Sequence, residues 1–335
     1  MGKMRILMFC ASFFGYEKRI LGALHDQDFD VDLYDELPNR NFVGKACVRY
    51  NVGLYRPVIR RYIEGIIDQN REKQYDYVFV IKGEAITGEA VALLREAYPS
   101  AKFVLYLWDS VANIPECERR IALYDRVLSF DPHDAQTYGM VFRPLFFAKE
   151  YEAQAMERGD YRYAFAFIGT AHTVRPLIAK KLAHACRTQG KETFAYLFLP
   201  HPMIYLYNKV CNPAYHTVKK SDIHFEALNA QQIKEVYQRS CCILDVEHQK
   251  QRGLTMRTIE LVGMQKKIIT TNSMVKEYDF YNPANICVID RQNPVVEEFF
   301  WAREYEPVPQ QILYRYSLEA FIREIFDLKE KEDGE

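Results

Sequence analysis

Residues 241–272 read CCILDVEHQKQRGLTMRTIELVGMQKKIITTN. The run CCILDV at 241–246 is short and apolar, and KKIITTN at 266–272 is rich in β-branched residues, so both are expected to be strands. The segment 255–264 between them has the apolar spacing of a helix, and Thr255 is a residue type that commonly caps a helix N-terminus. A strand, a helix and a second strand in this order predict part of a parallel sheet covered by helices.

The same alternation extends along the chain on both sides of this stretch. In the N-terminal half we expect strands at 4–10, 30–34, 76–82, 102–108 and 126–130, and helices at 16–25, 56–72, 87–97, 115–123 and 132–139. In the C-terminal half we expect strands at 163–169, 193–199, 222–228, 241–246, 266–272 and 284–290, and helices at 174–189, 229–239, 255–264 and 317–328. The polar stretch 143–162 interrupts the pattern and has no strand signal.

The pattern therefore predicts an α/β protein with two tandem doubly wound domains. We expect an N-terminal domain at 1–150, a linker at 151–162 and a C-terminal domain at 163–330. Ligands of open α/β sheets bind beyond the carboxyl ends of the strands, so function is expected in a cleft between the two domains.

The composition narrows the class of protein. The chain has 335 residues, of which 49% are hydrophobic and 27% charged, and its net charge is −1, so no global basic field favours nucleic acid as a partner. The N-terminus has neither a signal peptide pattern nor a membrane span, which predicts a cytoplasmic protein. The eight cysteines form no CxxC pair and no Cys/His cluster with zinc spacing, so no metal site is expected.

The common nucleotide-binding signatures are missing from the sequence. No GxGxxG follows the first expected strand, and no GxxxxGK[ST] occurs, which disfavours a nicotinamide-dependent enzyme and a P-loop NTPase. The sequence Asp30-Val31-Asp32 spells a DxD, a possible metal chelator, but its position favours a half-exposed strand.

FIGTAHTVR at 167–175 predicts a strand, a tight glycine turn and a helix. Gly169 would allow a close approach of the backbone, and the helix start near Thr173, together with Arg175, would suit a phosphate or a carboxylate. The alternative is a structural turn in which Thr170 or Thr173 caps the helix.

Residues 241–260 have the same order of strand, glycine-containing loop and helix as 167–175, with more polar groups in the loop. Asp245, Glu247 and His248 follow the strand, and the polar loop leads through Gly253 to the helix. Arg257 and Glu260 share a face of that helix. A surface ion pair would explain these two residues, but it leaves the glycine and the polar loop unexplained.

GLTMRTIELVGMQKKIITTN at 253–272 resembles the donor-nucleotide segment of GT-B-type glycosyltransferases, and YDFYNPANICVID at 278–290 resembles bacterial members that build lipopolysaccharide or capsule. Weaker similarity occurs in FIGTAHTVR and in RVLSFDPHDAQTYG at 126–139. The resemblance implies two Rossmann-like domains with an interdomain cleft, in which the C-terminal domain binds a nucleotide-sugar donor and the N-terminal domain binds the acceptor.

The resemblance also implies roles for individual residues. Glu260 matches the family's glutamate that contacts the donor ribose, and Thr255 to Arg257 match its diphosphate site. Many retaining members carry a second glutamate eight positions earlier, where this chain has Arg252, so the stereochemical outcome stays open. The expected donor-binding residues are Gly169, Thr170, Arg175, Glu247, Arg252, Gly253, Leu254, Thr255, Arg257 and Glu260.

The N-terminal domain offers candidates for a catalytic base at its strand ends. Asp109 is the first choice because it follows an apolar strand, although a carboxylate there would also cap the next helix. The further candidates are Glu84, Asp131 and His133, and Asp131, like Asp134, is also typical of a helix start beside Pro132.

Residues 40–70 are basic and interleaved with aromatics, which would suit a lipid-linked or anionic glycan acceptor and peripheral association with the cytosolic face of the inner membrane. A solvated helix face is the alternative. The expected function is glycosyl transfer from a nucleotide sugar, used as co-substrate without another cofactor or a metal, to a glycan or lipid-linked acceptor in surface-polysaccharide synthesis. A nucleotide-sugar epimerase and a non-catalytic nucleotide-sugar or glycan-binding protein are the alternatives.

Overall fold

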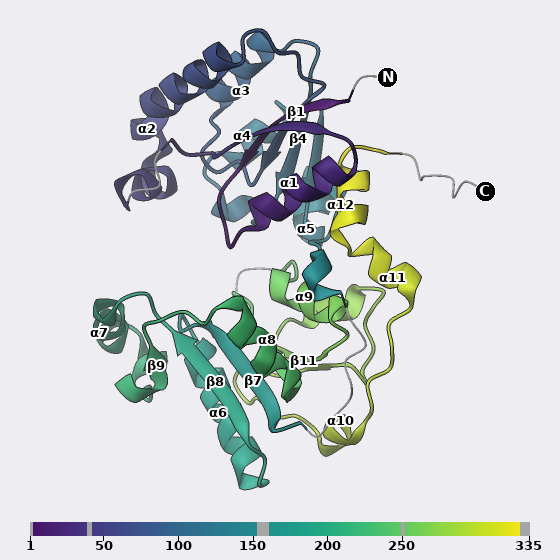
Figure 1. Cartoon of the computed structure of the whole chain (residues 1–335). Coiled ribbons are helices and arrows are strands. Elements are labelled where there is room, and N and C mark those ends of the chain that lie inside the picture. The colour runs from purple at the N-terminus through teal and green to yellow at the C-terminus, as the bar shows by residue number, and fades with distance from the viewer. Residues whose placement is uncertain (1–2, 39–41, 153–160, 249–251, 329–335) are drawn as a thin grey trace, which may run out of the picture. The chain divides into compact units, whose positions relative to one another are not determined.

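The computed structural model describes residues 3–38, 42–152, 161–248 and 252–328, and within 42–54 it describes the backbone only. The chain divides into two units, each built on one parallel sheet (Figure 1). The first unit comprises Met1–Ala148 and Arg315–Glu335, and the second comprises Lys149–Tyr314. The predicted class, α/β with two parallel sheets covered by helices, is confirmed.

The first unit contains a six-stranded sheet in the order β2-β1-β3-β4-β5-β6. All of its neighbouring strands pair in parallel. The strands are β1 (Arg5–Cys10), β2 (Asp30–Tyr34), β3 (Tyr77–Ile81), β4 (Lys102–Leu107), β5 (Arg126–Ser129) and β6 (Val141–Phe142). The helices are α1 (Tyr16–Asp26), α2 (Phe42–Gln69), α3 (Gly88–Ala97), α4 (Cys117–Ile121), α5 (Pro132–Tyr138) and α12 (Leu318–Ile325), with a 3-10 turn η1 (Val111–Asn113).

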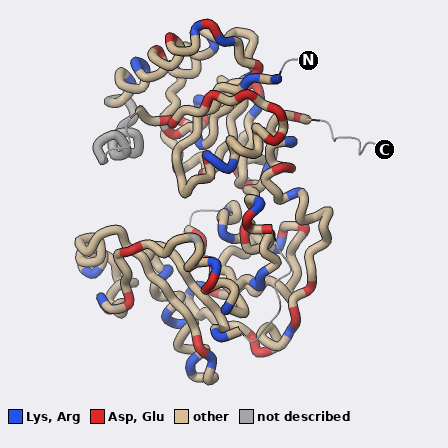
Figure 2. Tube along the Cα trace, viewed as in Figure 1, with Lys and Arg blue, Asp and Glu red and all other residues tan. Residues whose placement is uncertain are grey.

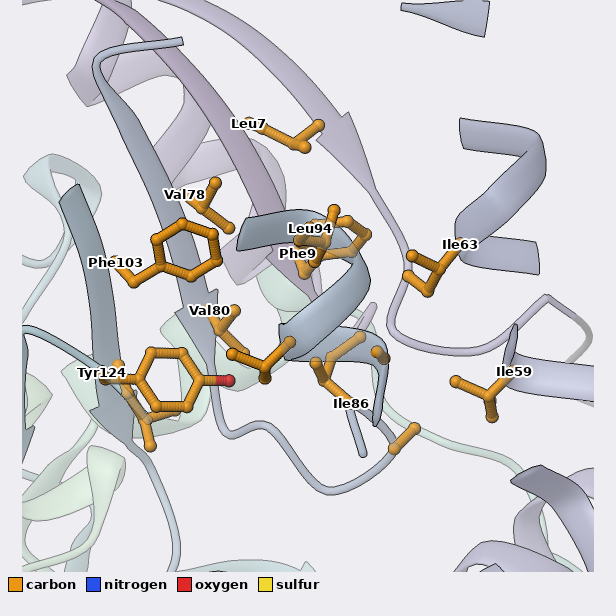
Figure 3. Close-up of a cluster of buried hydrophobic side chains, with 14 of the residues drawn as sticks. Leu7, Phe9, Ile59, Ile63, Val78, Val80, Ile86, Leu94, Phe103 and Tyr124 are labelled. Carbon is orange, nitrogen blue, oxygen red and sulfur yellow. The ribbon is translucent and has the colours of Figure 1, made fainter. Parts of the chain in front are cut away.

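One face of this sheet packs against α2 and α3, and Figure 3 shows the resulting core. Alternate residues of the central strands point to this face, as the two-residue repeat of a strand requires. The labelled members from the strands are Leu7, Phe9, Val78, Val80 and Phe103, and those from the helices and loops are Ile59, Ile63, Ile86, Leu94 and Tyr124.

The other face of the same sheet is covered in part by α12, which comes from the C-terminal end of the chain. The ring of Phe326 lies 5.2 Å from that of Phe79, and the ring of Phe321 lies 4.8 Å from that of Tyr106. Residues 315–328, which the sequence analysis assigns to the second domain, therefore belong to the first unit, where Phe321 and Phe326 are buried.

The second unit contains another six-stranded parallel sheet, in the order β12-β11-β10-β7-β8-β9. Its strands are β7 (Tyr163–Thr170), β8 (Thr193–Phe198), β9 (Ile223–His224), β10 (Ser240–Asp245), β11 (Lys267–Thr270) and β12 (Ile286–Val288). Its helices are α6 (Arg175–Thr188), α7 (Pro202–Cys211), α8 (Ala230–Gln238), α9 (Met256–Gly263), α10 (Glu298–Ala302) and α11 (Gln310–Arg315), the last ending where the first unit resumes. The 3-10 turns are η2 (Lys149–Tyr151), η3 (Pro213–Tyr215), η4 (Lys220–Asp222) and η5 (Ser273–Glu277).

Several boundaries differ from the expected ones. α2 begins at Phe42 rather than at 56 and continues through Pro57, and α7 lies where no helix is expected. The strand expected at 222–228 is reduced to Ile223–His224. Most of the expected linker, 153–160, lies outside the described residues.

Candidate functional site

The second sheet has its topological switch point between β7 and β10. From this central pair, β8 and β9 extend to one side and β11 and β12 to the other. Open α/β sheets bind ligands beyond the carboxyl ends of such a pair. We call this region, residues 169–175, 245–248 and 252–260, the β7–β10 edge; most of the expected donor-binding residues lie in it.

Asp245 is the buried centre of the β7–β10 edge, at the end of β10, and its side chain is 2% exposed. Its Oδ2 accepts hydrogen bonds of 2.6 Å from the hydroxyls of Thr255 and Thr258. Thr255 is the N-cap of α9, as predicted, and its Oγ1 accepts a bond from the Thr258 N–H. The carboxylate therefore holds the first turn of α9 against the end of β10, with the helix N-terminus at this edge.

Arg257 extends from the first turn of α9 across the end of β7. Its Nη1 lies 3.7 Å from Oδ1 of Asp245, and its side chain is 25% exposed. A Cβ atom at Gly169 would lie 3.2 Å from Cζ of Phe167 and 3.4 Å from both Nη atoms of Arg257, so the guanidinium lies against the end of β7 at this glycine. Burial opposes protonation of Arg257, but interactions with Tyr237 and Asp245 outweigh it and raise its pKa. Arg257 is therefore a fixed cation.

Arg175 supplies a second guanidinium to the same edge. It is half-buried at the first position of α6, and its Nε donates a 2.7 Å hydrogen bond to the Val246 carbonyl. Burial lowers the pKa of Arg175; the nearby carboxylate of Asp245 opposes this effect, and Arg257 adds to it. Because the two guanidinium groups repel each other, an anion between them would stabilise both charges.

The turn between β7 and α6 carries two features that the sequence analysis does not predict. Thr173 has a left-handed backbone with φ of 52°, which is uncommon for a threonine and often occurs at functional sites. Burial, together with Arg175, lowers the pKa of His172 to about 4, so its imidazole is neutral at neutral pH. Neither Thr170 nor Thr173 caps α6, because its N-cap is Val174 without a side-chain hydrogen bond.

Glu247 is bonded within the protein. Its carboxylate accepts hydrogen bonds from Arg291 and from Oγ1 of Thr271, the latter at 2.5 Å. Arg291 also donates to the Glu247 carbonyl at 3.2 Å. The described contacts thus give Glu247 the role of connecting the ends of β10, β11 and β12, whereas the sequence analysis expects it to contact the donor.

The loop before α9 is held from β11. The Asn272 amide donates hydrogen bonds to the carbonyls of Arg252, at 3.2 Å, and Gly253, at 3.4 Å. Gly253 and Leu254 are buried, whereas the Arg252 side chain is exposed. The backbone of this loop is therefore fixed beside the helix start.

Glu260 and Thr170 complete the expected donor-binding set. Glu260 is half-buried one turn after Arg257 and contributes to raising the pKa of Arg257, so the two are close enough to interact. Thr170 is exposed at the end of β7. The second unit thus brings together at one edge two guanidinium groups, a helix N-terminus, a neutral imidazole and a half-buried carboxylate.

In the first unit, two of the candidate bases lie at neighbouring strand ends. Glu84 follows β3 and forms a 2.6 Å ion pair with Lys82. Asp109 follows β4, and its Oδ1 accepts hydrogen bonds from the Ser110 N–H and the Asn113 amide at 2.9 and 2.8 Å. Burial opposes protonation of Lys82, but Glu84 and then Asp109 raise its pKa. Asp109 therefore stabilises the turn η1, although the N-cap of that turn is Ser110 rather than Asp109, and it also interacts with the half-buried cation of Lys82.

A buried carboxyl group fixes the loop that carries Lys82 and Glu84. Glu36, 2% exposed, accepts hydrogen bonds from the N–H groups of Gly83 at 2.7 Å and Ala85 at 3.1 Å. Burial raises the pKa of Glu36 to about 7. Lys82 itself has a left-handed backbone with φ of 74°. The structure thus maintains a strained loop that presents a cation and a carboxylate at the end of β3.

Of the remaining candidates, Asp131 is linked to Asp109 through Ser110, whose Oγ donates a 3.2 Å hydrogen bond to Oδ2 of Asp131. Asp131 is 2% exposed and caps α5 by accepting bonds from the N–H groups of His133 and Asp134 at 3.0 and 3.4 Å. The Asp134 carboxylate accepts a 2.7 Å bond from the Val111 N–H. The helix-start interpretation of Asp131 is therefore the one that the structure shows, and His133 is exposed on the same helix.

Among the described residues, no group of three or more His, Cys, Asp or Glu side chains is arranged to hold a metal ion. No helix in the described part of the chain is long and apolar enough to cross a membrane.

Comparison with known proteins identifies the fold. No protein-family model matches the chain, and no curated protein matches its sequence. An alpha-glucosyltransferase solved with UDP and a 13-mer DNA is similar in structure, with a TM-score of 0.62, 14% identity, and coverage of 97% of this chain and 99% of that chain. The lipopolysaccharide outer core galactosyltransferase WaaB, in its apo form, gives a TM-score of 0.55 at 13% identity, with the same coverage.

A structure of another class is also similar. The UDP-N-acetylglucosamine 2-epimerase of Rickettsia bellii gives a TM-score of 0.50 at 10% identity, covering 97% of this chain and 96% of that chain. The chain therefore has the GT-B fold over nearly its whole length, and this fold by itself allows either transfer or epimerisation.

Proposed function

We propose that this protein is a glycosyltransferase that uses a nucleotide sugar as its donor. The observation that carries the proposal is the pair of guanidinium groups, Arg175 and Arg257, beside the N-terminus of α9 at the switch point of the second sheet. Planar cations and helix N-termini are the groups that proteins use to bind phosphates. A diphosphate between them would also relieve the repulsion between the two arginines.

The proposed donor site has a second part on α9. Glu260, one turn further along the helix, is the candidate for the ribose hydroxyls. We propose that the two arginines and the helix N-terminus neutralise the leaving diphosphate without a bound metal. Transfer that continues in excess EDTA would support this part, and transfer that stops until a divalent cation is restored would refute it.

Donor binding is tested first, by measuring the melting temperature with UDP-, GDP-, CMP- and dTDP-sugars. The donor that raises the melting temperature most is then titrated against Arg257→Gln, Arg257→Lys and Glu260→Ala. We expect the glutamine variant to lose about tenfold or more in affinity and the lysine variant to lose less, because lysine keeps the charge but not the planar fork.

The matched control is Arg162→Gln, which changes an arginine at the opposite end of β7. Arg162 precedes the strand, its side chain is 57% exposed, and it pairs with Glu192 at 3.0 Å. Donor affinity should be unchanged in this variant. Equal affinities in the Arg257 and Arg162 variants, with both proteins folded by circular dichroism, would contradict the assigned site.

For the catalytic base we propose Asp109 first and Glu84 second. Both flank Lys82 at the carboxyl edge of the first sheet, and a base must lie within reach of the acceptor hydroxyl. Asp109→Asn preserves an oxygen that can accept the bonds from Ser110 and Asn113. We expect it to lower kcat about 100-fold or more with unchanged donor binding. If the kcat of Asp109→Asn is near that of the native protein, Asp109 is not the catalytic base and Glu84 becomes the candidate.

We further propose a glycan or lipid-linked acceptor in surface-polysaccharide synthesis, in the cytoplasm; the similarity to a lipopolysaccharide galactosyltransferase supports this. Peripheral association through residues 40–70 stays a prediction. Of the described arginines there, Arg56 pairs with Glu116, and Arg60 pairs with Glu64 and Glu89, which reduces the basic character of the segment.

The second candidate function is nucleotide-sugar epimerisation, because an epimerase has the same fold. Product analysis separates the two activities. An epimerase converts the sugar nucleotide with no acceptor present, whereas a transferase leaves the donor intact or slowly hydrolysed until an acceptor is added. Donor binding without turnover across an acceptor panel would instead indicate a non-catalytic binding protein.

A further inference from the structure

Helix α7 in the second unit turns its apolar side toward solvent. Met203, Leu206, Tyr207 and Val210 follow the spacing of one helical stripe and are 69%, 61%, 68% and 82% exposed. A surface helix ordinarily buries such a stripe against its own core. We refer to these four residues as the α7 stripe.

The inward side of α7 is polar and firmly attached. The Lys209 ammonium donates hydrogen bonds to the carbonyls of Tyr215, His216 and Val218 at 3.0, 2.8 and 2.9 Å. Tyr205 is 7% exposed, and its hydroxyl donates a 3.2 Å bond to the Val218 carbonyl. Turning the helix to bury the stripe would break all four bonds, so the outward orientation of the stripe is built into the fold.

The surroundings of the stripe are basic. Between Leu199 and Asp222 the sequence contains three lysines, of which Lys209 is bonded inward, and its only carboxylate is Asp222. That carboxylate accepts a 2.7 Å bond from Lys180. Lys219 and Lys220 are exposed and follow η3, which packs on α7. In Figure 2, α7 is drawn mostly in tan, because Lys209 is its only charged residue.

We propose that the α7 stripe is a membrane-surface anchor. The four apolar side chains would enter the boundary between lipid headgroups and acyl chains, and Lys219 and Lys220 would contact anionic headgroups. An apolar helix face beside exposed lysines is complementary to an anionic lipid surface, which offers both an apolar layer and negative charge. This inference does not depend on the proposed transferase activity, and it concerns a segment other than 40–70.

The test is cosedimentation of the full-length protein with vesicles of phosphatidylcholine, with and without phosphatidylglycerol. We expect binding that is strengthened by phosphatidylglycerol and weakened by salt. Met203→Ser, Leu206→Ser and Val210→Ser combined should reduce vesicle binding about tenfold or more, without changing the melting temperature, because these side chains are exposed. Lys219→Glu with Lys220→Glu should remove the preference for phosphatidylglycerol.

The control changes two other exposed apolar residues of the second unit, Val295→Ser and Phe299→Ser, which are 56% and 50% exposed. This variant should bind vesicles as the native protein does. In a Tyr207→Trp variant, brominated lipids should quench the new fluorescence. Failure of the native protein to bind vesicles would overturn the proposal. The proposal would also be overturned if the control variant lost as much vesicle binding as the stripe variant. It would be overturned too if the stripe variant bound vesicles normally and light scattering showed only the dissociation of a dimer.

Discussion

Glu36→Gln removes a carboxyl group that is buried at the end of β2 and accepts hydrogen bonds from the N–H groups of Gly83 and Ala85. Burial raises its pKa from 4.5 to about 7. Between these two values the folded protein keeps a proton that the unfolded chain has released. The stabilising contribution of the neutral form is therefore complete below pH 4.5 and is lost as the pH rises through 7.

The size of this effect follows from the pKa values. A rise from 4.5 to about 7 corresponds to about 3 kcal/mol of the free energy of unfolding. The difference between the native protein and Glu36→Gln should therefore fall by about 3 kcal/mol between pH 4.5 and pH 8. Glutamine also replaces one acceptor oxygen by an NH2 group that faces an N–H donor, but this cost adds an offset that does not vary with pH.

The assay is urea denaturation followed by tryptophan fluorescence. The chain has two tryptophans, so a Trp301→Phe background leaves Trp108 to report on the first unit. The control is Glu96→Gln, which changes an exposed carboxylate of α3 in the same unit. A difference that stays flat with pH, or that grows as the pH rises, would refute the assignment of a neutral buried carboxyl group.

Three further predictions concern the β7–β10 edge. Gly169→Ala places a Cβ 3.2 Å from Cζ of Phe167 and 3.4 Å from both Nη atoms of Arg257, so we expect small shifts of these side chains; titration should show donor affinity falling several-fold with only a modest change in melting temperature. Asn272→Ala removes the amide that donates to the carbonyls of Arg252 and Gly253 and accepts from the Met274 N–H; we expect at least about 1 kcal/mol of lost stability in urea, with a larger fractional loss of donor binding by calorimetry. The pKa of His172 is lowered to about 4, so the stability that its neutral form contributes is lost as the pH falls from 6.5 toward 4. In His172→Gln the melting temperature should therefore depend less on pH over this range.

The fold was predictable because its determinants are local. Buried parallel strands require continuous apolar runs, and the helices between them carry their own start signals. Thr255 illustrates this: the sequence predicts a helix cap, and its hydroxyl accepts the hydrogen bond of a cap. Asp131 is a candidate base in the sequence, and the structure shows its alternative role as a helix cap. The alternation of such elements was sufficient to predict two parallel sheets.

Local sequence patterns do not predict the elements whose position depends on tertiary contacts. The sequence analysis does not predict α7, whose apolar stripe faces solvent and whose orientation depends on carbonyl groups of the following turn. The C-terminal helix was assigned to the second domain by chain order, although its aromatic side chains pack on the first sheet.

The sequence predicts which strand ends carry the candidate site, but not the hydrogen bonds that hold its residues in place. Gly169 and Arg175 are predicted because they follow a strand end, and Arg257 and Glu260 because they share a helix face and match the donor segment that the sequence resembles. The supporting partners come from distant positions: Asn272 lies 20 residues after the carbonyl of Arg252 that it bonds, and Gly83 lies 47 residues after Glu36. Such pairs depend on how the strands are ordered in the sheet, and a single sequence does not contain that information in any local pattern.

The position of α12 has a consequence for synthesis of the chain on the ribosome. Its Phe321 and Phe326 complete the aromatic packing of the first sheet, yet more than 160 residues of the second unit are translated between that sheet and this helix. The second unit can therefore finish folding first, while the part of the sheet face covered by α12 stays exposed. A nascent chain that stalls before residue 318 would expose that apolar surface. Chaperones and proteases would then bind the N-terminal unit as an incompletely folded protein.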